Sequence, residues 1–187
     1  MTQATASTVT RLFASPEGRL AVIVVAVFVL MAGLSPDRFL SVQNLTSMAF
    51  QFPEFAILAL AMTVTMLTGG IDLSVVGIAN LSAIVAAMIL TNMTGSGDGV
   101  GVLVLALGAA LCVGLLAGLF NGILVAMLGL PPILATLGSG LIFTGIAIAL
   151  TGGSAVMGFP VAAAWIGNST IFGVPTPLIL FALLAVG

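Results

Sequence analysis

Long apolar stretches make up most of this chain, and this pattern constrains its fold more than any single residue does. A helix needs about 20 apolar residues to cross the hydrocarbon core of a membrane. Only 4% of the residues are charged, whereas soluble domains carry about 25%. The sequence therefore predicts an all-α, polytopic transmembrane bundle of about five to six helices. The candidate spans are residues 20–34, 45–67, 73–90, 100–128 and 133–150, with a sixth segment starting near Pro175.

The polar N-terminal segment, residues 1–19, is expected to be a cytoplasmic tail. Arg11 and Arg19 precede the first apolar stretch, and basic residues favour the cytoplasmic side of membrane helices. With the N-terminus inside, residues 69–72 lie at the cytoplasmic side and residues 151–175 face outward.

Residues 20–187 are expected to form one transmembrane domain whose sixth helix is incomplete. The twelve residues from Thr176 to the end are almost all apolar. They cover about 18 Å as a helix, whereas the hydrocarbon core is about 30 Å thick. The sequence therefore predicts the N-terminal portion of a longer protein.

The composition excludes several classes of function. The chain has no lysine, no histidine and one cysteine. A nucleotide-binding P-loop needs a lysine, a Ser-His-Asp triad needs a histidine, and metal clusters need several ligands. Three arginines cannot make a nucleic-acid-binding patch. We therefore expect no enzyme, no cofactor and no metal site, which leaves a transport path, an anchor or a docking surface.

One carboxylate interrupts a long apolar run. Asp72 follows Gly69 and Gly70 and precedes Ser74. An acidic side chain at membrane depth costs about 2.5–3.5 kcal/mol on insertion scales. Either the break is a tight turn with Asp72 at the N-cap of the next helix, or it is an unwound segment that exposes backbone groups to a solute cavity. Both interpretations make Gly69, Gly70, Asp72 and Ser74 candidates for a pivot or path.

Other polar and small residues lie within the predicted helices. Glu54 follows Pro53, which either kinks the helix or marks its start; the carboxylate either reaches the interface or lines the path. Asn121 and Thr136 are further path candidates. Gly114, Gly118 and Gly122 form a ladder of small residues that lets helices approach closely.

Three motifs, taken together, resemble a known family. The first is Thr-Gly-Gly-Ile-Asp-Leu-Ser-Val at residues 68–75. The second is Gly-Leu-Phe-Asn-Gly at residues 118–122, followed by Leu-Pro-Pro-Ile-Leu-Ala-Thr-Leu-Gly at residues 130–138. The third is Leu-Thr-Gly-Gly at residues 150–153. Their order and spacing are similar to those of the permease subunits of bacterial ribose-type ABC transporters, from about residue 44 to the end. The family's glycine after Ser-Val is replaced in this chain by Val76, with Gly77 next.

The resemblance implies a multi-pass permease subunit in the bacterial inner membrane. Such a subunit imports a simple sugar, or a sugar-like signal such as autoinducer-2. It works with a cytoplasmic ATP-binding subunit, a periplasmic sugar-binding protein and a second permease copy. The family's cytoplasmic coupling loop would follow the sixth helix, after Gly187.

Two alternatives remain from the residues alone. A proton-coupled secondary carrier would use Glu54 and Asp72 as relay acids. A membrane fragment that does not transport would depend on neither acid.

Overall fold

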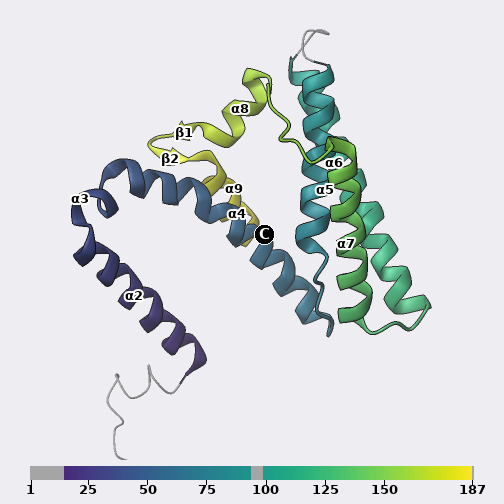
Figure 1. Ribbon diagram of the computed structural model, residues 1–187, viewed down its shortest axis with the longest axis horizontal. Coiled ribbons are helices and arrows are strands. Elements are labelled where there is room, and N and C mark those ends of the chain that lie inside the picture. The colour runs from purple at the N-terminus through teal and green to yellow at the C-terminus, as the bar shows by residue number, and fades with distance from the viewer. Residues whose placement is uncertain (1–14, 94–98, 187) are drawn as a thin grey trace, which may run out of the picture. The chain divides into compact units, whose positions relative to one another are not determined.

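The computed structural model describes residues 15–93 and 99–186. Within these residues, five helices are long and apolar enough to cross a membrane, so the predicted all-α polytopic bundle is confirmed. They are α2 (Pro16–Leu34), α4 (Val42–Leu67), α5 (Val75–Asn92), α6 (Gly99–Gly122), which continues as the π-helix η1 (Ile123–Met127), and α7 (Pro132–Thr151). Figure 1 labels these helices in chain order.

The first unit of the chain, residues 1–49, contains α2, the short helix α3 (Pro36–Phe39) and the start of α4. Ser15 caps α2 by accepting the backbone N–H of Gly18 at 3.0 Å. Residues 16–19 form the first turn of α2, and the rest of the predicted cytoplasmic tail, with Arg11, lies almost entirely outside the described residues. The rings of Phe28 and Phe39 meet edge to face at 5.0 Å, which ties α3 to α2.

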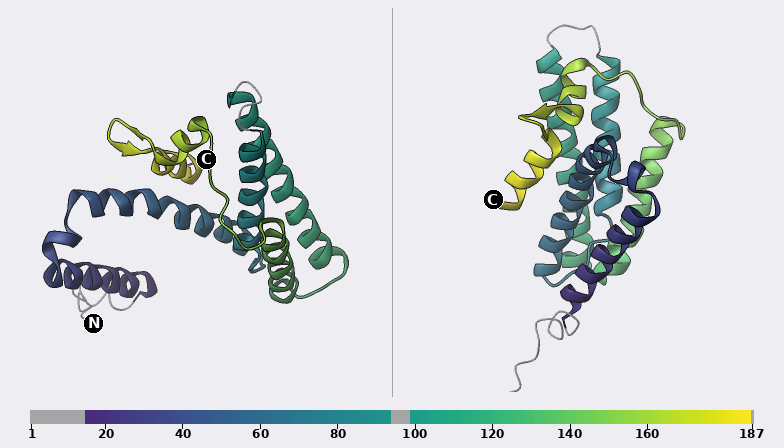
Figure 2. Two further views of the ribbon diagram at one scale, coloured as in Figure 1. Left: turned by 45° about the horizontal axis from the view of Figure 1, so that its top comes forward. Right: turned by 90° about the vertical axis from the view of Figure 1, so that its left-hand side faces the viewer.

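The second unit, residues 50–187, is built around α5. Helices α6 and α7 both run beside α5 in every view (Figures 1 and 2). Leu81 of α5, Ala117 of α6, and Phe143 and Ala147 of α7 form the buried apolar core between them.

Helices α5 and α7 approach each other closely at two glycines. A Cβ added at Gly77 would lie 2.6 Å from the carbonyl oxygen of Gly140. A Cβ added at Gly140 would lie 3.1 Å from the Cα of Ser74. Only residues without a side chain allow the backbones to approach this closely. This contact therefore holds the start of α5 against α7.

Pro53 lies inside α4, eleven residues after the helix begins, so the interpretation of Pro53 as a helix start is wrong. A proline removes one helical hydrogen bond, but the apolar sequence on both sides continues the helix. Glu54 is therefore a mid-helix residue.

The stretch predicted as a long outer segment contains regular structure. It holds α8 (Val161–Asn168) and an antiparallel hairpin of β1 (Thr170–Ile171) and β2 (Val174–Pro175). Phe172 and Gly173 form the two-residue turn with φ values of 53° and 81°. The sixth apolar segment begins where expected, as the short helix α9 (Thr176–Val186).

Candidate functional site

The break between α4 and α5 is an ordered, non-helical segment. Helix α4 ends with Gly69 donating its N–H to the carbonyl of Met66 at 3.1 Å. Gly69 has a φ of +85°, a conformation that residues with a side chain rarely adopt. The chain then turns away from the helix axis and reaches α5 at Val75.

Asp72 fixes the end of this segment. Its Oδ1 accepts the backbone N–H of Ser74 at 2.8 Å and the Ser74 hydroxyl at 2.6 Å. A side-chain oxygen that accepts the N–H two residues on forms an Asx turn. The N-cap residue of α5 is Ser74, not Asp72 as one interpretation expected. Asp72 instead orients the residue that precedes the helix.

Asn121 extends this arrangement to α6. Its Nδ2 donates to the Ser74 hydroxyl at 2.6 Å. Ser74 is completely buried and Asn121 is 5% exposed. The carboxylate, the hydroxyl and the amide thus form one chain of hydrogen bonds. The Asn121 Oδ1 atom is buried and has no hydrogen-bond partner, and leaving such an atom unpaired costs about 1–3 kcal/mol.

Thr136 ties the same segment to α7. Its hydroxyl oxygen accepts the N–H of Leu73 at 3.0 Å. Its single proton is directed to the carbonyl of Pro132 at 2.7 Å or to that of Ile71 at 3.2 Å. The break is therefore held by α6 through Asn121 and by α7 through Thr136.

A cavity of about 380 Å³ opens beside these residues. This volume lies near the lower end of the range for ligand sites, about 300–1,000 Å³. The break itself supplies two unpaired hydrogen-bond donors to the cavity. Among the described residues, the N–H groups of Gly70 and Ile71 have no partner. The lining consists of Thr65, Thr68, Gly69, Gly70, Ile71, Asp72, Gly118, Asn121, Gly122, Val125, Pro132 and Thr136.

The cavity brings together most of the candidates from the sequence. Gly69, Gly70, Asp72, Asn121 and Thr136 all line it, and Ser74 lies directly behind them. The π-helix η1 contributes Val125. A π-helical turn widens a helix and is frequent at functional sites.

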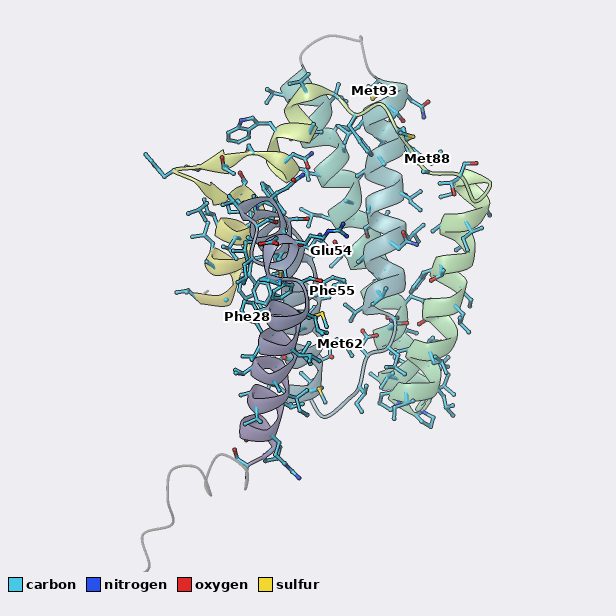
Figure 3. All side chains as sticks on the ribbon, turned by 60° about the vertical axis from the view of Figure 1, so that its left-hand side comes forward. Phe28, Glu54, Phe55, Met62, Met88 and Met93 are labelled. Carbon is cyan, nitrogen blue, oxygen red and sulfur yellow. The ribbon has the colours of Figure 1, made fainter. Side chains whose placement is uncertain are left out.

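Glu54 does not belong to this cavity. It is an exposed residue of α4 (Figure 3) and lines a separate groove of about 490 Å³ with Asn80 and apolar residues of α4 and α5. Glu54 and Asp72, the two acids of the proton-coupled carrier alternative, therefore line different cavities.

The glycine ladder of α6 has two kinds of environment. A Cβ at Gly114 would lie 3.8 Å from the Ser82 hydroxyl of α5. Apart from chain neighbours and the backbone of the same helix, no heavy atom of the described residues lies within 4 Å of a Cβ at Gly118 or Gly122, which both line the cavity. Close helix packing by Gly118 and Gly122 stays a prediction.

The close contact between Gly77 and Gly140 was not predicted from the sequence, because their positions along the chain gave no sign that they meet.

Comparison with known proteins agrees with the family that the sequence motifs indicate. Residues 44–186 match the family described as the permease component of the branched-chain amino acid transport system. The chain is 37% identical over 154 residues to the Autoinducer 2 import system permease protein LsrC of Escherichia coli strain SMS-3-5, covering 82% of this chain and 43% of that protein. It is 34% identical over 174 residues to the permease protein LsrD of Klebsiella pneumoniae, covering 90% of this chain and 50% of that protein. No solved structure matches.

The five apolar helices and the family match define a multi-pass membrane protein of the transport-permease class. This chain belongs to the family of permease components of the branched-chain amino acid transport type, and the resemblance drawn from its motifs is confirmed. The chain spans about half the length of the curated relatives it matches.

Proposed function

We propose that this chain forms part of the membrane-spanning permease subunit of an ATP-driven importer for a simple sugar or a sugar-like solute. The observation that carries the proposal is the cavity beside the break. It is lined by residues of two of the three motifs, those at residues 68–75 and 118–138, which lie far apart in the sequence. The names of the relatives refer to autoinducer 2 import, which supports a sugar-like solute.

The proposal implies partners, because the sequence contains no lysine for a nucleotide-binding P-loop. A cytoplasmic ATP-binding subunit would supply the energy. A periplasmic sugar-binding protein would deliver the solute, and a second permease copy would complete the path. The subunit would lie in the bacterial inner membrane, with the N-terminus in the cytoplasm as Arg11 and Arg19 suggest.

The geometry suggests how the subunit takes part in transport. The break is non-helical and is held by a few hydrogen bonds. Asn121 of α6 donates to the Ser74 hydroxyl, and Thr136 of α7 accepts the N–H of Leu73 and can donate to the carbonyl of Ile71. Such a segment can move with one helix relative to another when ATP binding changes the helix arrangement. Gly69 and Gly70 would act as the pivot, and the cavity would present the solute to either side in turn.

Replacement of Asp72 by asparagine separates this proposal from a proton-coupled carrier. The amide oxygen of the new side chain can still accept both bonds from Ser74. The loss of charge weakens them by about 1 kcal/mol, or about fivefold. We therefore expect uptake of radiolabelled sugars, beginning with D-ribose, to fall by no more than about fivefold in vesicles that carry the gene product and its partners.

Asp72→Ala serves as the matched control, because it removes the acceptor and should reduce uptake much further. Glu54→Gln should leave uptake close to the unsubstituted level. A relay acid must carry a proton, so complete loss of uptake in Asp72→Asn, with the protein present at normal amounts, would contradict the proposal and favour the carrier.

A further inference from the structure

We propose that Asn121 is a solute-binding residue whose Oδ1 atom accepts a hydrogen bond from a hydroxyl group of an uncharged polyol held in the cavity. This inference rests on the proposed function and adds the binding atom and the chemical class of the solute. It starts from the unpaired state of that atom. Asn121 Oδ1 is buried without a partner in a residue that is 5% exposed and lines the cavity.

The orientation of the amide follows from its neighbours. The Ser74 hydroxyl has one proton, which it donates to Asp72 Oδ1 at 2.6 Å. The Ser74 oxygen can therefore only accept from Asn121, and it does so from Nδ2 at 2.6 Å. If the amide were reversed, two oxygens would face each other. The carboxylate of Asp72 thus sets the orientation that leaves Oδ1 without a partner.

The unpaired Oδ1 differs from the other unpaired buried oxygen in the described residues. Ser82 Oγ also lacks a partner. Ser82 lies opposite Gly114 in the α5–α6 contact and does not line the cavity. Asn121 lines the cavity and Ser82 does not, so the two unpaired oxygens make a matched pair for a test.

The rest of the lining indicates the class of solute. The hydroxyls of Thr65 and Thr68 donate to the carbonyls of Met62 and Thr65, at 2.8 and 2.7 Å, which leaves their lone pairs available. The N–H groups of Gly70 and Ile71 supply unpaired donors on the same lining. A hydroxyl group both donates and accepts, so it suits this mixture.

A bare cation suits the cavity less well. The oxygens of the lining could coordinate a cation, but the N–H groups of the break would repel it. Asp72 Oδ1 is also less available as a ligand, because it already accepts two hydrogen bonds. The remaining lining at Gly118, Val125 and Pro132 is apolar and can pack against the C–H face of a small ring. These features favour an uncharged polyol of the size of a simple sugar.

A cysteine-protection experiment tests the inference in the complete gene product. Val125→Cys places a thiol at a residue that lines the cavity. Cys112, which is exposed elsewhere on α6, is replaced by alanine, and any cysteine outside residues 1–187 is replaced as well. The rate of modification by a small methanethiosulfonate reagent is measured with increasing D-ribose as the probe. We expect D-ribose to slow the modification. Adding Asn121→Ala should raise the half-protecting concentration by about fivefold to tenfold.

Ser82→Ala in the same background is the control, and it should leave the half-protecting concentration unchanged. Absence of protection with Asn121 in place overturns the inference without requiring any Asn121 variant to fold. Equal protection in Asn121→Ala, or protection by sodium chloride instead of D-ribose, also overturns it. ATP-dependent uptake by the same preparation tests the proposed function separately, because uptake can persist when the protection fails.

Discussion

Gly77→Ala is expected to destabilise the protein more than any other single-methyl substitution in α5. The added Cβ would lie 2.6 Å from the carbonyl oxygen of Gly140. This oxygen belongs to the backbone of α7 and cannot rotate away as the end of a flexible side chain could. Helices α5 and α7 must therefore move apart to make room for the methyl group. Overpacking of this kind costs about 1–3 kcal/mol, and sometimes more. Thermal unfolding of the purified gene product in detergent, followed by circular dichroism, measures the loss.

Gly138→Ala in α7 is the matched control. No heavy atom lies within 4 Å of a Cβ at that position among the described residues. Alanine is favoured over glycine in a helix by about 0.5–1 kcal/mol, so this variant should be as stable as the unsubstituted protein or slightly more stable. Equal stability of the Gly77 and Gly138 variants would show that α5 and α7 do not make the close contact.

Thr136→Val is expected to release the break from α7. Valine has nearly the same shape as threonine but cannot accept the N–H of Leu73, which Thr136 accepts at 3.0 Å. Thr136 is 4% exposed, so water cannot replace the lost partner easily. The variant should lose about 1–3 kcal/mol of stability. It should also make the peptide bonds of residues 69–74 more accessible to a protease added to membrane vesicles.

Thr144→Val, about two turns further along α7, is the matched control. Within the part of the chain that the structure describes, the hydroxyl of Thr144 bonds only to the carbonyl of Gly140 in its own helix, at 2.8 Å. Its removal should change stability by no more than about 0.5 kcal/mol. If the two threonine variants behaved alike, the bond across the break would contribute nothing specific.

The membrane spans could be predicted well from the sequence, because each span is marked by a local run of apolar residues. The end of α4 at Leu67 and the starts of α7 and α9 follow directly from apolar length and from the positions of glycine and proline. The break at residues 68–74 could be found for the same reason, since two glycines and a carboxylate interrupt an apolar run.

The contacts that build the site could not be predicted from local patterns. Gly77 and Gly140 lie far apart in the chain, and each is only one of 23 glycines. The bond between Asn121 and Ser74 joins residues 47 positions apart. The turn at Phe172 and Gly173 was also missed, because a bulky residue rarely adopts a positive φ.

The energy source of transport distinguishes an ATP-driven importer from a proton-coupled carrier. Vesicles carrying the gene product, its ATP-binding partner and its solute-binding protein would be loaded with ATP on the cytoplasmic side, and radiolabelled sugar uptake measured with and without a proton uncoupler. We expect uptake that requires ATP and persists with the uncoupler. Uptake that continues without ATP and collapses with the uncoupler would contradict the proposed function.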